Sequence, residues 1–320
     1  MKLWLIVLIV LIVLLVVAYL GMGYVIFDKL GNIKGSCAEH LANRPDNFAL
    51  HPDWPADFDV TPYYMSPYEV VRFPSRDPGF EVAGWWMPRD PDAPAVILVD
   101  GLGGCKNSIA VLVPAGMLWR NGFNVLMIDL RDTGDSTQDD GRSTIGNEEH
   151  RDVLGAWDWL VSEKGFDPSK IGLFANSLGG ANANYAFAAE PRIAALFLQS
   201  TFGNLQQIIS AELTRNNYPT FLAPGALLMG SILTGTNLFA RNPVETIRQA
   251  AGRPVYIVHT RADTRIAISQ SEQLAAAAQA AGVNVTTWFP DNGEHVQTPA
   301  AYPDEFEQRM VGFFRSTFGD

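Results

Sequence analysis

The segment Ile171–Ala181 constrains the fold of this chain more than any other. An apolar run, Ile171–Phe174, ends at a polar corner that carries Ser177, and small residues follow. This order predicts a buried strand, a tight turn and a helix, with the hydroxyl of Ser177 exposed at the turn. Ala175 and Gly179 are small enough for the strand and the helix to approach closely. The segment also fits an ordinary glycine-rich helix start, so the rest of the chain has to decide.

Strands and helices alternate along residues 65–320. Apolar or alternating runs predict strands over Glu69–Arg76, Phe80–Pro88, Ala95–Val99, Asn124–Leu130, Ile171–Phe174, Ile193–Gln199, Val255–His259 and Val283–Phe289. Helical patterns cover Ser108–Arg120, Glu148–Lys164, Gln273–Ala281 and Asp304–Phe318. The alternation predicts an α/β fold, with a mostly parallel central sheet and helices on both faces.

One stretch, 203–247, breaks this alternation. It contains two apolar, helix-like runs, Leu205–Leu213 and Phe221–Leu233, among several prolines and glycines. We expect a small helical cap inserted over the site. A crossover helix with long loops is the alternative, and the sequence hardly separates the two.

The N-terminus is apolar enough to cross a membrane. Leu3–Phe27 contains no charged residue, and as a helix it would reach about 37 Å, more than the ~30 Å of a bilayer core. We expect residues 1–27 to form an uncleaved transmembrane anchor, because a signal peptide has a shorter apolar region and ends in a small-residue cleavage site. Residues 28–64 would be a linker or arm. An anchor this close to the start favours an extracytoplasmic domain, although the flanking charges leave the orientation open.

Composition excludes several classes of function. The net charge is −11 and no basic block occurs, so we expect no nucleic-acid partner. Cys37 and Cys105 lack metal-ligand spacing and are too few for a disulfide framework. A single bridge between them is possible only if the domain lies outside the cytoplasm. We do not favour that bridge, but the sequence leaves the pairing open. No metal site and no cofactor is expected, and the sequence leaves the oligomeric state open.

Three polar residues follow three different predicted strands. Ser177 needs a base to take its proton, and the base needs a carboxylate that fixes its tautomer. His295 is the candidate base and Asp263 the candidate acid, and the carboxyl ends of parallel strands meet at one edge of the sheet. The backbone amides of Leu178 and Leu102 are the candidate oxyanion donors.

Motifs around these residues resemble those of a known superfamily. The segment Asp129–Ser136 resembles an Asp-x-Arg-Gly-x-Gly-x-Ser loop, Val258–Asp263 a His-Gly-x-x-Asp acid loop, and Gly293–His295 a Gly-x-His loop. In this order, together with the serine corner, they resemble serine hydrolases of the α/β-hydrolase superfamily, in the branch of esterases and acylaminoacyl-peptidase relatives. The resemblance runs from about Val70 to Phe314. It implies the α/β-hydrolase fold and an acyl-enzyme mechanism that cleaves an ester bond, or an amide or thioester bond, of a small-molecule acyl substrate.

The chain departs from the superfamily pattern at four positions. Asp100 stands where such loops often carry His, and Ala175, Asp132 and Thr260 each replace a glycine. None of these changes removes a catalytic group. We expect Asp100 to turn away from the site or to be paired, since its charge would oppose a developing oxyanion.

Each candidate also has a simpler interpretation. His295 could be a surface-loop residue and Asp263 a helix N-cap, with Asp135 and Asp291 as rival carboxylates. We expect His259 to be a packed structural residue. The remaining histidines, His40, His51 and His150, are expected at the surface, and Glu148, Glu149 and Asp152 on a solvated helix face.

Two other functions stay open at this point. The replaced glycines fit a catalytically inactive binding or scaffold domain. The resemblance to acylaminoacyl peptidases leaves a peptidase as a further alternative to an esterase.

Overall fold

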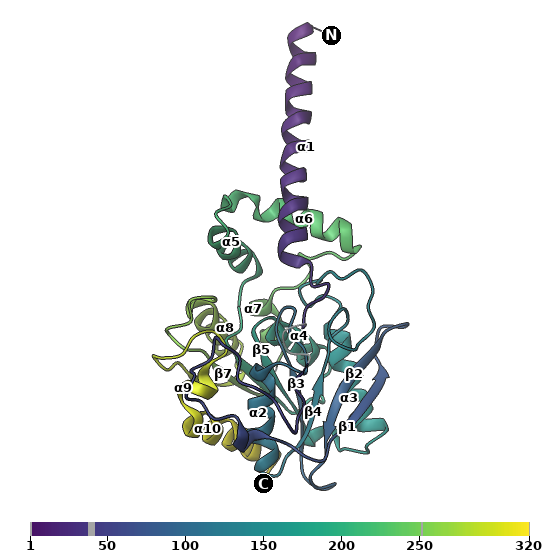
Figure 1. The fold of residues 1–320 in the computed structure, drawn as a ribbon. Coiled ribbons are helices and arrows are strands. Elements are labelled where there is room, and N and C mark those ends of the chain that lie inside the picture. Colours follow the sequence, from purple (N-terminus) through teal and green to yellow (C-terminus); the bar gives the residue numbers. More distant parts are fainter. Residues whose placement is uncertain (1, 38–41, 251, 320) are drawn as a thin grey trace.

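Eight strands form one twisted sheet in the order β1-β2-β4-β3-β5-β6-β7-β8 (Figure 1). The computed structural model describes residues 2–37, 42–250 and 252–319. The strands are β1 Glu69–Pro74, β2 Glu81–Met87, β3 Ala95–Val99, β4 Asn124–Ile128, β5 Ile171–Asn176, β6 Ala195–Gln199, β7 Pro254–Val258 and β8 Asn284–Trp288. Strand β2 pairs antiparallel with β1 and β4, and all other neighbours are parallel. The expected α/β fold with a mostly parallel sheet is therefore confirmed.

Helices cover both faces of this sheet. The α-helices of the α/β core are α2 Ile109–Arg120, α3 His150–Ser162, α4 Ser177–Ala189, α8 Ser269–Ala280, α9 Thr298–Ala301 and α10 Pro303–Phe318. Helices α2 and α10 pack on one face, and α3, α4 and α8 pack on the other. Both faces are buried, which explains why β3, β4, β5 and β6 are nearly continuous apolar runs rather than alternating ones.

The segment between β6 and β7 rises above the carboxyl ends of the strands. It contains α5 Leu205–Arg215, α6 Ala223–Thr234 and α7 Pro243–Thr246, with short 3₁₀ turns at Thr220–Leu222 and Ile247–Ala250. Further 3₁₀ turns lie at Thr61–Tyr63 and Pro168–Lys170. We call residues 203–247 the cap. Figure 1 shows α5 and α6 lying beside the inner end of the N-terminal helix.

The N-terminal helix α1 runs from Leu3 to Gly31, four residues beyond the expected end of the apolar run. Its outer part projects away from the domain (Figure 1). Its inner part belongs to the fold: Ile26 and Phe27 are buried among apolar side chains of the cap. By length and composition α1 could cross a membrane, as an anchor or as a signal sequence.

The chain after α1 returns to the sheet along the α2 face. Phe48, Trp54 and Tyr63 of this arm are buried in the same apolar cluster as α2 and α10. The pairing that the sequence left open, and that we did not favour, is present: Cys37 and Cys105 form a disulfide with their Cα atoms 6.0 Å apart. The bond joins the start of the arm to the loop that follows β3. The two cysteines are 68 residues apart, so the sequence alone does not show that they lie close together.

Candidate active site

Ser177 lies at the turn between β5 and α4. Its φ of 51° is in the left-handed region, which is uncommon for a residue other than glycine. The chain can turn this sharply because its neighbours are small: a β-carbon on Gly179 would lie 2.3 Å from the carbonyl oxygen of Asp100. Ala175 is fully buried in β5, between Val99 and Leu198. The turn therefore holds the Ser177 side chain above the end of the sheet.

His295 contacts both of its expected partners. Its Nε2 atom lies 3.0 Å from Ser177 Oγ, and its Nδ1 atom lies 2.8 Å from Asp263 Oδ2. The imidazole comes from the loop after β8 and Asp263 from the loop after β7. The winding of the sheet thus brings together three side chains that are up to 118 residues apart in the sequence.

Asp263 uses its two oxygens differently. Oδ1 accepts hydrogen bonds from the backbone N–H groups of Arg265 and Ile266, at 2.9 and 2.8 Å. This closes a turn of the loop, but it does not cap α8, which begins at Ser269. Oδ2 faces the histidines. Burial alone would raise the pKa of Asp263, but the hydrogen bonds from His259 and His295 outweigh it and hold the pKa below its usual range.

His259 is a second histidine on the same carboxylate. Its Nε2 atom lies 3.0 Å from Asp263 Oδ2 and 2.9 Å from the carbonyl oxygen of Ile266. On its other side, Nδ1 lies 2.7 Å from Ser271 Oγ. The side chain is fully buried, as expected of a packed structural histidine. We did not predict its contact with Asp263 from the sequence. The available signal was that His259 and Asp263 are four residues apart just beyond a strand.

The loop after β3 lies directly against the Ser177 turn. A β-carbon on Gly101 would lie 2.9 Å from Ser177 Cβ. Leu102 and Leu178, the two expected oxyanion donors, line the same cavity as Ser177. The carboxylate of Asp100 accepts a hydrogen bond from the Gly101 N–H and packs against Gly104, where an added β-carbon would lie 2.4 Å from Asp100 Oδ2. Asp100 lines the cleft as well, but its side chain is folded onto its own loop.

Two hollows meet at Ser177. The larger cleft, of about 690 Å³, is lined about equally by polar and apolar atoms and also borders His295, Asp100 and the arm around His51. The other is a cavity of about 360 Å³ with a mainly apolar lining that includes Leu178, Phe202, Ile208 and Phe27. A molecule with one polar and one apolar part could therefore occupy both sides of the serine at once.

Two of the residues that stand in place of glycine have a clear structural role. Asp132 has a φ of 62°, the left-handed region that favours glycine, and its carboxylate accepts hydrogen bonds from the N–H groups of Asp139 and Gly141. Thr260 donates a hydrogen bond from Oγ1 to the carbonyl oxygen of Gly293, at 2.6 Å. This bond ties the Asp263 loop to the His295 loop.

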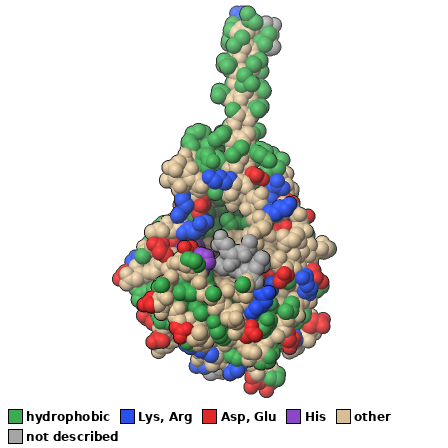
Figure 2. Space-filling model, in the orientation of Figure 1, with side chains coloured by type: hydrophobic (Ala, Val, Ile, Leu, Met, Phe, Trp, Pro, Cys, Tyr) green, Lys and Arg blue, Asp and Glu red, His purple; other side chains and the backbone are tan. Residues whose placement is uncertain are grey.

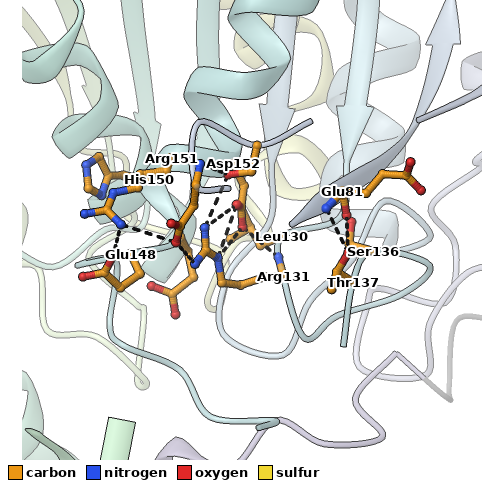
Figure 3. A network of polar contacts seen from close by, with 12 residues as sticks. Glu81, Leu130, Arg131, Ser136, Thr137, Glu148, His150, Arg151 and Asp152 are labelled. Carbon is orange, nitrogen blue, oxygen red and sulfur yellow. Dashed lines mark hydrogen bonds and ion pairs between the residues drawn. The ribbon is translucent and has the colours of Figure 1, made fainter. Parts of the chain in front are cut away.

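The acidic residues at the start of α3 are not a solvated face. Asp152 is fully buried and binds the guanidinium of Arg131, which lies 2.7 Å away (Figure 3). Glu149 is also buried, and its carboxylate accepts hydrogen bonds from the N–H groups of Thr144 and Gly146. Only Glu148 is partly exposed, and it pairs with Arg151. The prediction failed because the loop after β4 folds over this helix start, which periodicity does not reveal.

The remaining candidates divide as follows. His150 is buried rather than at the surface, and burial lowers its pKa to about 4. His51 is half-buried in the larger cleft, and His40 lies outside the described residues. The rival carboxylates are elsewhere: Asp135 pairs with Lys106, and Asp291 is 84% exposed. Within the described ranges no group of three or more His, Cys, Asp or Glu side chains could hold a metal ion.

The fold and this site define a hydrolase of the α/β-hydrolase class. Residues 114–320 match the model of the prolyl oligopeptidase family. The chain therefore belongs to the prolyl oligopeptidase family.

The chain is also similar to two uncharacterized bacterial proteins. An uncharacterized Escherichia coli protein is 27% identical over 41% of this chain, and an uncharacterized Mycobacterium tuberculosis protein is 29% identical over 62%. The matches span only 45% and 64% of those relatives' lengths.

The Pyrococcus furiosus esterase Pf2001 aligns with a TM-score of 0.63 at 20% identity, over 79% of this chain and 93% of its own. An acylaminoacyl peptidase of Pyrococcus horikoshii aligns at 0.58 and 17% identity, over 79% of this chain and 42% of its own. These likenesses support the fold.

Proposed function

We propose that this chain is a membrane-anchored serine hydrolase that cleaves an ester bond through an acyl-enzyme on Ser177. The observation that carries the proposal is the position of His295, within hydrogen-bond distance of both Ser177 Oγ and Asp263 Oδ2. Hydrogen-bond contact from nucleophile to base, and from base to an orienting carboxylate, is the arrangement that activates a serine hydroxyl.

The mechanism assigns one role to each group. Ser177 Oγ attacks the ester carbonyl carbon while His295 Nε2 takes the hydroxyl proton, and Asp263 stabilises the imidazolium that forms. The backbone N–H groups of Leu178 and Leu102 receive the oxyanion. His295 then gives its proton to the departing alcohol. Water, deprotonated by the same imidazole, attacks the acyl-enzyme, and this step returns the acid product and free Ser177.

The two hollows favour an ester with an apolar acyl group. The cavity lined by Leu178, Phe202 and Ile208 offers an apolar acyl chain a mainly apolar surface, and the polar side chains of the larger cleft beside His295 offer the alcohol hydrogen-bonding partners. Such a division supports an esterase over a peptidase. A panel of acyl esters of graded chain length beside aminoacyl amides tests this choice. Faster cleavage of the amides would favour the peptidase.

Labelling with a fluorophosphonate tests the nucleophile. The full chain in detergent should react, Ser177→Ala should not, and Ser316→Ala, which removes an exposed hydroxyl on α10, should react like the wild type. His295→Gln and Asp263→Asn should lower kcat about 10⁴-fold. Absence of label on folded wild-type protein would support the inactive-scaffold alternative instead.

The packing of α1 supports an anchor rather than a cleaved signal sequence. Cleavage near the end of α1 would remove Ile26 and Phe27 from the core of the cap, and would remove the hydrogen bond from Tyr19 Oη to the carbonyl oxygen of Phe221. Mass spectrometry of the mature N-terminus and alkaline extraction of membranes test this point. The Cys37–Cys105 bond supports an extracytoplasmic domain, because cytoplasmic thiols are kept reduced. Protease protection in oriented membrane vesicles tests the side.

A further inference from the structure

Helix α6 is apolar over most of its surface, and its two hydroxyl side chains, Ser231 and Thr234, donate hydrogen bonds to carbonyl oxygens of the helix itself. The sequence Ala223–Thr234 contains no charged residue. Its outer side, continued from the turn before it, carries Phe221, Leu228 and Ile232, which are 67, 44 and 62% exposed. Among the described residues outside α1, six large apolar side chains are exposed, and four of them lie in residues 221–239. A helix of this kind is normally buried in a core or in a membrane.

Helix α6 is joined to α1 by close contacts along one face. Tyr19, Gly23 and Phe27 follow one another at four-residue steps, so they lie on the same side of α1. A β-carbon on Gly23 would lie 2.5 Å from the carbonyl oxygen of Gly225, which shows that the two backbones touch. The Phe27 ring packs directly on Gly230 of α6, where an added β-carbon would lie 2.5 Å from the ring. The apolar surface of α1 therefore continues without a break onto α6.

The length of α1 indicates how deep its contact with α6 would lie in a membrane. A helix needs about 20 residues to cross a hydrocarbon core of about 30 Å. Trp4 and Tyr24 are separated by that number of residues, and both side-chain types favour the membrane interface. The crossing at Gly23 then falls at the edge of the core on the side of the domain. Figure 2 shows apolar side chains gathered at this level on both sides of α1, with Lys and Arg side chains below them.

The apolar cavity lies between the inner end of α1 and Ser177. Its lining includes Phe27 and Leu30, which follow Gly23 by one to two turns of α1, together with Ile208 and Ile209 of α5 and Ser177 itself. An acyl chain that left the bilayer beside α1 would meet mainly apolar surface along this route.

We infer that helix α6 is embedded in the membrane interface beside α1, and that the apolar cavity takes the acyl chain of a lipid ester from that membrane. The second part rests on the proposed function. In the reaction, Ser177 Oγ bonds to the acyl carbon, the lipid C–O bond breaks, and the lipid alcohol leaves with the proton from His295. Water then releases the fatty acid and restores Ser177.

A depth measurement tests the first part without any need for activity. In the full chain, Ile232→Cys adds a reactive thiol, since Cys37 and Cys105 are bonded to each other. The thiol is labelled with bimane and the protein is placed in phosphatidylcholine vesicles whose acyl chains carry a doxyl quencher. Val70→Cys is the matched control, because Val70 is 68% exposed on edge strand β1. Strong quenching at position 232 alone is expected, and equal weak quenching at both positions would overturn the insertion of α6.

A comparison of two substrates tests the second part. Ile232→Asp and the control Val70→Asp are assayed in phosphatidylcholine vesicles, with a long-chain ester of umbelliferone held in the bilayer and with a water-soluble short-chain ester. A carboxylate at position 232 opposes insertion, so cleavage of the bilayer ester should fall about tenfold, while cleavage of the soluble ester should stay unchanged. The control should keep both activities.

The outcomes separate this inference from the proposed function. Wild-type protein that cleaves the soluble ester but not the bilayer ester, or Ile232→Asp that keeps full activity on the bilayer ester, would overturn the lipid-substrate part. Wild-type protein that cleaves neither ester and takes up no fluorophosphonate would contradict the proposed function, and with it the lipid-substrate part. The quenching result would still decide whether α6 is inserted.

Discussion

His259 lies 3.0 Å from Asp263, on the same carboxylate oxygen that faces His295. The carboxylate is therefore held from two sides, by a histidine that reaches Ser177 and by one buried behind it. Because hydrogen bonds to the charged form keep the pKa of Asp263 low, the ionised state is retained in a buried position where desolvation would otherwise raise that pKa.

The first prediction concerns this second histidine. His259→Gln should lower kcat about ten- to a hundredfold with little change in KM, because the variant weakens a hydrogen bond to a charged group worth about 1.5–3 kcal/mol. Ser271→Ala, which removes the contact behind His259 and the hydrogen bond from Ser271 to the Thr201 carbonyl oxygen, should have a smaller effect in the same direction. Steady-state kinetics across pH, with Tm measured in parallel, check this. A lower Tm with unchanged kcat would show that His259 is structural only.

The second prediction concerns the space beside the nucleophile. Gly101→Ala places a methyl group 2.9 Å from Ser177 Cβ and 3.3 Å from its Oγ. We expect this to displace the hydroxyl from His295 and to lower kcat about a hundredfold or more, since small misplacements at a reacting centre are costly. Fluorophosphonate labelling should slow in proportion.

Gly312→Ala on α10 is the control for this substitution, because no atom lies within 4 Å of the added carbon. It should keep full activity and add up to about 1 kcal/mol of stability, as alanine does in helix interiors. Full activity of Gly101→Ala would show that the loop after β3 moves aside and does not hold Ser177 in place.

Periodicity and turn chemistry were enough to predict the sheet and the positions of Ser177, Asp263 and His295 at strand ends. The signals are local: continuous apolar runs predict buried strands, and polar residues directly after them predict the functional edge. The distances from His295 to its two partners confirm that the three side chains meet, while their catalytic role stays a proposal.

The errors arose where one segment folds over another. Asp152 and Glu149 look like a solvated face because their partners, Arg131 and the Thr144 amide, come from a loop that crosses the helix start. Cys37 and Cys105 are brought together by the return of the arm along the domain. Such contacts depend on the path of the chain between the elements, and a pattern read along one element does not contain it.

The third prediction concerns the buried His150. Burial lowers its pKa from 6.5 to about 4 in the folded state, so between these values the unfolded chain binds one more proton. The free energy of unfolding should therefore fall as the pH drops from 6.5 to about 4, by up to about 3 kcal/mol from this residue. His150→Gln should flatten the decline, as measured by denaturation in detergent across that range. An identical pH dependence in both proteins would contradict this assignment.

The fourth prediction concerns the bond between Cys37 and Cys105. It closes a loop with a sequence separation of 68, for which chain entropy predicts a stabilisation of about 4 kcal/mol. It also holds the loop that carries Leu102, because Cys37 Sγ contacts the carbonyl oxygen of Gly103, 3.6 Å away. Cys37→Ser combined with Cys105→Ser should therefore lower the Tm by many degrees and also lower kcat, because the Leu102 amide is no longer held beside Ser177.

Dithiothreitol provides the control for the disulfide. It should bring the wild-type Tm down to that of the double variant and leave the double variant unchanged, since only the wild type has a bond to reduce. Thiol titration before reduction checks the pairing directly. Two reactive thiols in the native protein isolated without reductant would contradict the bridge. They would also remove the support that it gives to an extracytoplasmic domain, because a reduced pair is what a cytoplasmic location predicts.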